Sequence, residues 1–185
     1  RLVVGGFSRV YEINRNFRNE GISQQHNPEF TMLEFYEAFA TVDDLMTMLE
    51  EMMGNIARSC SASGDAVVRY GQGDDGEDQL LDFGHAFARI SVWDGIAKWG
   101  GLQGDAIHDE AQLRGKLASH GIELNASAPV GKLQMELFEH VAEPHMIQPT
   151  FVTGFPVDVS PLSRRNDDDP RLADRFELYI GGFEV

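Results

Sequence analysis

The sequence predicts an α+β fold in which an antiparallel β-sheet is flanked by helices and carries a small helical insertion. Alternating apolar and polar residues over 9–40 predict two paired strands. Apolar residues at helical spacing over 43–60 predict a long helix, and strand patterns return from residue 149 after several short helices. With 185 residues, the chain is long enough to bury a full core as one domain.

The first two predicted strands, roughly residues 9–20 and 29–40, are joined by a loop too long for a tight turn. Side chains alternate between the two faces of a strand, so odd and even positions lie on different faces. The odd positions are mostly large and apolar, and we expect them to bury against the body of the domain: Tyr11, Ile13, Phe17, Leu33, Phe35 and Phe39. The even positions are mostly polar or aromatic: Glu12, Asn14, Asn16, Arg18, Glu20, Phe30, Met32, Glu34 and Tyr36.

The even face has two interpretations. A solvated sheet face is the plain one, but such faces tend to be rich in Lys, Thr and Ser rather than in Asn, Arg, Glu, Phe and Tyr. The connecting loop adds His26, Asn27 and Pro28, which supply donors, a ring and a stiffened entry into the second strand. We therefore favour a binding pocket on this face. Its ligand would have an anionic part, a flat ring and a cationic group.

The helix predicted over 43–60 has a possible N-cap at Thr41 or Asp43. Its apolar positions are Leu45, Met48, Leu49, Met52, Met53 and Ile56. The methionines could form an exposed binding stripe, but core packing is the favoured interpretation because Met fills irregular gaps well.

Short strands are predicted at 66–70, 79–83 and 88–90, separated by the acidic loop 71–78, which we interpret as solvated. Three short helices follow at 91–99, 109–120 and 129–141. They form a predicted helical insertion over residues 91–145, between a sheet segment at 1–90 and its return at 146–185. Its four histidines have no ligand spacing, and we interpret them as surface or packing residues: His108, His120, His140 and His145.

The C-terminal part returns to strands. Residues 150–155 are apolar and β-branched, a long polar loop follows, and 174–185 reads as a strand pair broken at Gly181-Gly182.

Charge and cysteine content limit the function classes. There are 30 Asp and Glu against 15 Lys and Arg, a formal charge of −15, which argues against a broad nucleic-acid footprint made by this chain alone. Residues 1–27 are instead basic, where an anion would bind. The single cysteine, Cys60, excludes an intrachain disulfide and suits a cytoplasmic setting. We expect no membrane association, because no apolar run approaches the length of a span.

The segments VVGGF, VYEINRNFRNEG and HNPEFTMLEFY, in this order and without a gap, resemble motif 2 of the class II aminoacyl-tRNA synthetases. The wording HNPEFTMLEFY resembles the lysine branch of that family. Near the C-terminus, VSPL-RRND and RFELYIGG-E are similar to the catalytic sheet of the same enzymes. The resemblance is weakest across 91–145, and it implies a class II synthetase-like antiparallel sheet.

The resemblance implies lysine activation by ATP to lysyl-adenylate and transfer to tRNA(Lys), with L-lysine, ATP and tRNA(Lys) as partners and Mg²⁺ as cofactor. Arg18 matches the motif 2 arginine that bridges the lysine carboxylate and the α-phosphate, and is the implied catalytic residue. The other residues that match ATP contacts are Glu20, His26, Asn27 and Phe30. Those that match lysine contacts, besides Arg18, are Glu34 and Tyr36.

Glu177 and Glu184 match the two acids that hold Mg²⁺ in the family; from the sequence alone, two exposed strand acids would be the favoured reading. Motifs 1 and 3 and the anticodon-binding domain have no match in the chain, so we expect a partial catalytic domain that is inactive alone, from a protein that is a homodimer when complete. Two alternatives stay open: a tRNA-independent paralogue that lysylates a protein, and a non-catalytic nucleotide-binding module.

Overall fold

The computed structural model describes residues 1–19, 21–22, 26–72 and 76–185. The chain divides into two compact units, residues 1–41 and residues 42–185.

The first unit is a β-hairpin preceded by a turn over residues 2–6. Strands β1 (Arg9–Phe17) and β2 (Glu29–Glu37) pair antiparallel over their whole length, as predicted. The register places Glu12 opposite Glu34, Asn14 opposite Met32 and Asn16 opposite Phe30. Residues directly opposite each other share a face, so the predicted even face exists as a continuous surface.

The expected burial of the odd face is wrong for five of its six residues, and Phe35 is half-buried. Tyr11, Ile13 and Phe17 are 74%, 67% and 72% exposed, and Leu33 and Phe39 are exposed as well. On the even face, by contrast, Val10, Asn16, Phe30 and Met32 are half-buried. Alternation determines which side chains share a face, but not which of the two faces is covered.

The second unit is built on a four-stranded sheet with the order β10-β9-β6-β5. Its strands are β5 (Ala88–Ser91), β6 (Thr150–Thr153), β9 (Glu177–Ile180) and β10 (Phe183–Glu184). The sheet is mixed rather than antiparallel throughout, because β5 runs parallel to β6. Such a parallel pair needs a long crossover, and the helical residues 92–145 provide it.

Two smaller strand pairs complete the second unit's β-structure. They are β3 (Val67–Gln72) with β4 (Asp78–Asp82), and β7 (Phe155–Pro156) with β8 (Leu172–Ala173). Both pairs are antiparallel.

The helices lie at the predicted positions. They are α1 (Val42–Cys60), α2 (Val92–Gly95), α3 (Glu110–Ser119) and α4 (Val130–Val141), with short turns at Ile96–Gly100, Gly104–His108, Glu143–His145 and Val157–Val159. Ser91 caps α2 by accepting a hydrogen bond from the Asp94 backbone N–H, and Asp109 caps α3 in the same way from Gln112. Ile96–Gly100 is a π-helical turn that ends at Gly101 with a φ of 73°.

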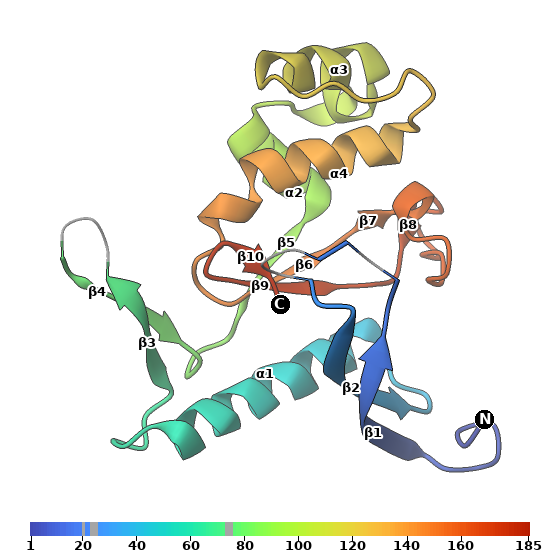
Figure 1. Ribbon diagram of the computed structural model, residues 1–185. Helices are drawn as coiled ribbons and strands as arrows, with labels where there is room; N and C mark the ends of the chain where they lie inside the picture. The colour runs from blue at the N-terminus through green and yellow to red at the C-terminus, as the bar shows by residue number, and fades with distance from the viewer. Residues whose placement is uncertain (20, 23–25, 73–75) are drawn as a thin grey trace. The chain divides into compact units, whose positions relative to one another are not determined.

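Helices lie on both faces of the four-stranded sheet (Figure 1). On one face, Val152 and Tyr179 pack with the buried side of α4, including Leu133, Leu137 and Phe138. On the other face, residues of β6 and β9 pack with α1 through a second apolar cluster: Met46, Ala57, Phe151, Leu178 and Ile180. Because residues of α2–α4 and of the sheet share one core, the helical segment does not form a core of its own.

The methionines of α1 are divided between two sides of the helix. Met46 is buried and Met53 packs against the same cluster, in agreement with core packing. Met48 and Met52 instead line a shallow groove with Ile56 and Cys60.

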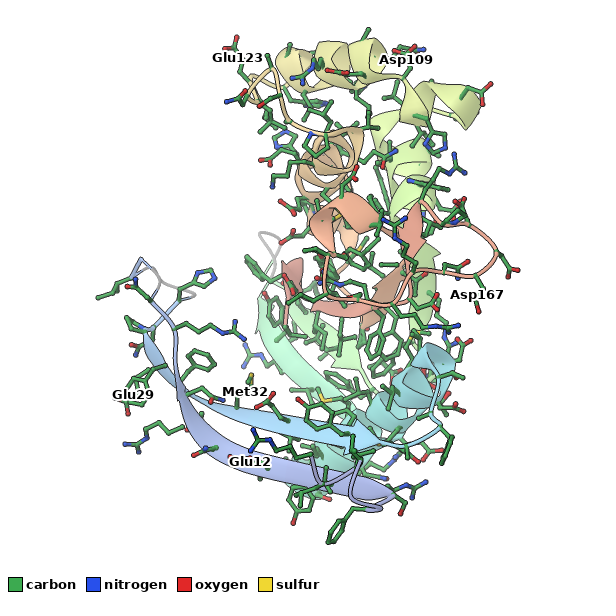
Figure 2. The ribbon with its side chains drawn as sticks, turned by 90° about the vertical axis from the view of Figure 1, so that its right-hand side faces the viewer. Glu12, Glu29, Met32, Asp109, Glu123 and Asp167 are labelled. Carbon is green, nitrogen blue, oxygen red and sulfur yellow. The ribbon has the colours of Figure 1, made fainter. Side chains whose placement is uncertain are left out.

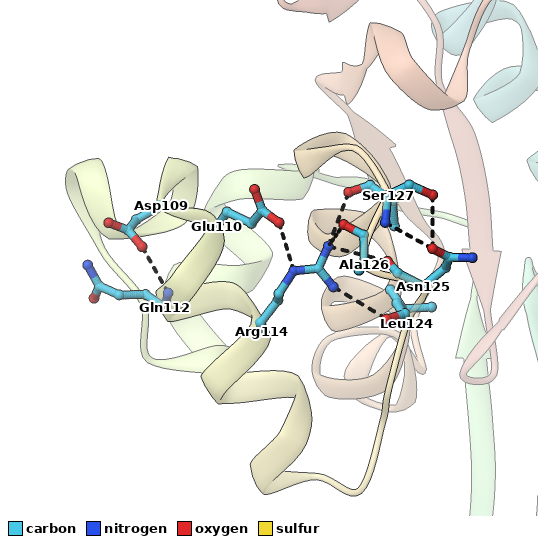
Figure 3. Close-up of polar contacts among 9 residues, drawn as sticks. Asp109, Glu110, Gln112, Arg114, Leu124, Asn125, Ala126 and Ser127 are labelled. Atoms are coloured by element: carbon cyan, nitrogen blue, oxygen red, sulfur yellow. Dashed lines mark hydrogen bonds and ion pairs between the residues drawn. The ribbon is translucent and has the colours of Figure 1, made fainter.

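One arginine fastens the loop between α3 and α4 (Figure 3). The Arg114 guanidinium donates hydrogen bonds to Glu110 and to four backbone carbonyls, those of Leu124, Asn125, Ala126 and Ala128. These carbonyls belong to a segment without regular structure, where no helix or strand hydrogen bonds are available to them. The Arg114 guanidinium supplies the donors that they need.

Candidate functional site

The even face of the hairpin gathers most of the predicted ligand-binding residues. Figure 2 shows the side chains of Glu12 and Met32 on the two strands. The strand register brings Glu34 and Phe30 into the same row as Met32, and Tyr36 continues it. Regular pairing therefore fixes the order of these groups along one surface.

Arg18 and Phe30 form one end of this surface. The Arg18 guanidinium carbon lies 5.2 Å from the centroid of the Phe30 ring, within the range of a cation–π contact. The Arg18 backbone N–H donates to the Pro28 carbonyl at 2.9 Å, which extends the pairing beyond β1. Phe30 is half-buried rather than sealed in a core, so its ring is available as a platform.

A hollow of about 300 Å³ lies at the other end. Glu12, Glu34 and Tyr36 line it from the strands, together with Val10 and Tyr11. Its remaining wall is the N-terminal turn, through Arg1, Leu2 and Val3.

Glu12 and Glu34 stand directly opposite each other across the strands. Like charges in this arrangement destabilise a sheet, unless a cation compensates them. The Asn14 amide donates to Glu12 Oε1 at 2.7 Å and so offsets part of the repulsion. Arg1 lines the same hollow, so one positive charge opposes the two carboxylates, and a net negative charge remains to attract a cationic group.

The loop residues lie at the hairpin tip. His26 and Asn27 are both exposed, and the Asn27 side-chain oxygen accepts a hydrogen bond from the Glu29 backbone N–H at 3.4 Å. Glu20, the predicted adenine contact, lies outside the residues that the structure describes.

The predicted metal ligands lie in the second unit. Glu184 of β10 is paired with Tyr179 of β9, and Glu177 lies two residues before Tyr179 on the same strand. Both carboxylates therefore project from one face of the sheet. The turn between the strands uses Gly181 and Gly182, with φ of 67° and 84°, so the predicted break is confirmed.

Glu177 and Glu184 differ in their surroundings. Glu184 is exposed, whereas the Glu177 side chain is only 15% exposed. Glu177 forms an ion pair with Arg175 through one oxygen and accepts a hydrogen bond from the Tyr179 hydroxyl through the other, at 3.2 Å.

The helices packed on this face add negative charge. Burial raises the pKa of Glu139 on α4, Lys132 lowers it in part, and the carboxylates of Glu136 and Glu184 raise it further. The pKa of Glu143 is raised by burial and then by Glu139 and Glu184. The negative electrostatic potential around Glu184 therefore favours binding of a cation.

The histidines follow the packing interpretation. His108 packs edge-on against Trp93, His120 against His140, and His145 stacks on Trp99. Over residues 1–19, 21–22, 26–72 and 76–185, no three His, Cys, Asp or Glu side chains are grouped in a way that could hold a metal. In the same ranges, no helix is both long and apolar enough to span a bilayer.

Sequence reasoning did not identify three contributors to these surfaces. Glu12 was assigned to the polar face, but its position opposite Glu34 depends on the register. The Asn16 amide nitrogen is shielded from solvent and has no hydrogen-bond partner among the residues described. Arg175 lies two residues before Glu177. Residues two apart share a face when both belong to one strand, but β9 begins at Glu177, so the spacing did not predict their contact.

Comparison with known proteins agrees with the motifs. Residues 1–185 match the family of class II tRNA synthetases (D, K and N). The chain is 47% identical over 186 residues to a lysine–tRNA ligase of Teredinibacter turnerae, covering 100% of this chain and 37% of that relative. For the lysine–tRNA ligase of Yersinia enterocolitica the identity is 48% over 186 residues, with 100% and 35% covered. The chain thus spans about a third of the length of the curated relatives it matches.

Proposed function

The chain belongs to the class II tRNA synthetases (D, K and N), and from this premise we propose that it forms part of the site in which a lysine–tRNA ligase activates lysine with ATP. One observation carries the proposal: a single hairpin face joins an arginine-stacked ring to an acidic hollow. Its ligands would have a flat base, anionic phosphates and an alkyl ammonium group, and the face offers a partner for each.

Arg18 and Phe30 are the proposed nucleotide end. A half-buried phenyl ring provides a surface on which adenine can stack. The guanidinium is permanently charged and has donors in a planar fork, so it can contact the lysine carboxylate and the α-phosphate together. His26 and Asn27, exposed at the hairpin tip, are proposed contacts of the outer phosphates.

Glu34 and Tyr36 are the proposed lysine end. An ammonium group removed from water needs a counter-charge, and Glu34 supplies one in the hollow. Glu12, directly across the strand pair, adds a second carboxylate. The aromatic sides of Tyr11 and Tyr36 line the space for the alkyl chain.

The reaction needs no covalent enzyme intermediate. The lysine carboxylate attacks the α-phosphorus of ATP, pyrophosphate leaves, and the resulting lysyl-adenylate acylates tRNA(Lys). The proposed roles of the hairpin residues are to hold the two reactants in line and to neutralise charge at the α-phosphate. These roles depend on position, which the paired strands provide.

Glu177 and Glu184 fit a magnesium ion by their chemistry. Mg²⁺ is commonly bound through one or two carboxylates together with substrate phosphates, and two carboxylates project here from one sheet face. When bound, the ion would supply positive charge that neutralises phosphate oxygens. Glu184 would be the more accessible of the two ligands, since it is exposed.

The test is equilibrium binding of lysine by titration calorimetry to the chain and its variants. Glu34→Gln removes the charge in the hollow, and we expect lysine affinity to fall at least about tenfold, because a buried ammonium would lose a charge partner. Glu29→Gln is the matched control: it changes an acid of the same strand on the opposite face, ion-paired with Arg15.

A parallel pair addresses the nucleotide end. Arg18→Ala is expected to weaken ATP binding by about tenfold or more, whereas Arg15→Ala, on the odd face of β1 just before it, leaves it unchanged. Equal effects of the two members of either pair would contradict the assignment of the even face as the binding surface.

A further inference from the structure

We propose that Arg175 is a built-in counter-cation for the predicted metal ligands, which keeps the affinity of Glu177 and Glu184 for a divalent cation low until nucleotide phosphates add further ligands. This inference rests on the proposed function, because it concerns the same two acids.

Arg175 is fixed from three sides. One terminal nitrogen forms the ion pair with Glu177, and the other donates to the Ser160 hydroxyl at 3.1 Å. The guanidinium carbon lies 4.5 Å from the centroid of the Phe155 ring. Ser160 and Phe155 are 3% and 1% exposed, so both anchors belong to the interior. The contact with Glu177 is therefore part of a built arrangement rather than a surface ion pair.

The Glu177 carboxylate uses both of its oxygens. Oε1 contacts the Arg175 guanidinium, and Oε2 accepts the hydrogen bond from the Tyr179 hydroxyl. An incoming cation that uses Oε1 meets a positive charge at the same atom. Even in a water-like dielectric, a divalent ion about 6 Å from a guanidinium is repelled enough to lower its affinity by about tenfold.

The opposite side of the site is acidic. Glu184 lies on the same sheet face as Glu177, and Glu139 and Glu143 interact electrostatically with Glu184. Their negative charge favours a cation near Glu184, although Lys132 offsets part of it at Glu139. Arg175 opposes this attraction at Glu177, where the metal would otherwise gain its second carboxylate.

The consequence is an order of binding. Mg²⁺ retains several waters and is usually held by one or two carboxylates plus substrate phosphates. With Arg175 present, the phosphates have to supply the missing attraction, so the ion is expected to enter together with ATP. Replacing Arg175 by an uncharged residue would uncouple the two events.

The experiment is a titration of the chain with Mn²⁺ in the absence of nucleotide, in which free Mn²⁺ is followed by electron paramagnetic resonance. Arg175→Met is expected to bind Mn²⁺ about tenfold more tightly than the unmodified chain. Arg175→Lys keeps the charge and should stay within about threefold of the unmodified chain. Arg89→Met is the matched control, because Arg89 pairs with Asp43 and lies on the other face of the sheet.

A second readout is the increase in thermal midpoint on adding Mg²⁺, which should be larger for Arg175→Met than for the unmodified chain. If Arg175→Met does not fold, Arg175→Gln serves instead, since its amide can still donate to Ser160. Tyr179 still holds Glu177 Oε2 in both variants, so the ligand keeps one of its two contacts.

The outcomes separate the inference from the proposed function. Equal Mn²⁺ affinity for the unmodified chain and the uncharged variant would overturn the role of Arg175. The test for the acids is Glu177→Gln and Glu184→Gln, each combined with Arg175→Met. If neither weakens Mn²⁺ binding, the assignment of the two acids as metal ligands is wrong, whatever Arg175 does.

Discussion

Replacing Gly95 by alanine tests the packing between α2 and α4. Gly95 is buried at the end of α2 and has helical backbone angles, φ −61° and ψ −47°, that alanine adopts readily. An added Cβ would lie 2.5 and 2.8 Å from two carbons of the Phe138 ring and 3.3 Å from the Ala142 Cβ. Phe138 is fully buried and cannot move into solvent. The substitution therefore forces a core ring to shift.

Two effects of opposite sign decide the outcome. Helix propensity alone favours alanine over glycine by about 1 kcal/mol. Overpacking of a well-filled core costs about 1–3 kcal/mol, and contacts this short place the site in the upper part of that range. We therefore expect Gly95→Ala to lower the free energy of unfolding by about 1–2 kcal/mol.

Gly115 in α3 offers a matched control. It is exposed, and a Cβ added there meets nothing within 4 Å. Gly115→Ala should therefore raise the free energy of unfolding by up to about 1 kcal/mol through propensity. Urea unfolding followed by circular dichroism measures both variants. The packing argument fails if Gly95→Ala is as stable as the unmodified chain while Gly115→Ala behaves as expected.

Three further predictions concern charged groups of the second unit. Arg114→Lys should destabilise by about 1–2 kcal/mol in urea unfolding, because one ammonium cannot reach the four carbonyls that the guanidinium fork satisfies. Burial and then Arg171 lower the pKa of His108, so the unfolded chain binds the proton more readily. Stability should therefore fall as the pH drops below about 6.5, and His108→Gln should flatten this dependence of the urea midpoint. The hydrogen bonds from Arg171 lower the pKa of Asp169 to about 2. Its contribution should be complete above about pH 4 and lost between pH 4 and 2, and Asp169→Asn should remove this acid limb.

Local chemistry made much of the fold predictable. The two-residue period of 9–40 specified two strands and which residues share a face, and the observed register agrees. Ser91 and Asp109 are the first residues of two predicted helices, and in the structure each caps its helix by accepting a backbone N–H that the helix leaves unpaired. Gly181 and Gly182 marked the last turn because both adopt positive φ.

Contacts between distant segments were not predictable in the same way. The parallel pairing of β5 with β6 joins residues about sixty positions apart, and no local pattern distinguishes it from an antiparallel pair. Arg175 contacts Ser160 and Phe155 because β7 pairs with β8, which lies just before Arg175 in the chain. The motif resemblance identified Glu177 but carried no information on the residue that neutralises it.

The exposed odd face of the hairpin bears on how the candidate site is held. An isolated two-stranded hairpin is only marginally stable, so its register depends on cross-strand pairs. The odd face supplies them: Tyr11 opposite Phe35, Ile13 opposite Leu33, and the ion pairs of Arg9 with Glu37 and of Arg15 with Glu29. Such pairs contribute about 0.2–1 kcal/mol each.

A slip of one residue would exchange the two faces and remove every proposed ligand contact from the binding surface. The apolar odd row was expected to anchor the hairpin by burial. With that row exposed, pairing along the strands is what holds Arg18, Phe30 and Glu34 in one line. The position of these binding residues on the even face is therefore maintained by the cross-strand pairs of the odd face.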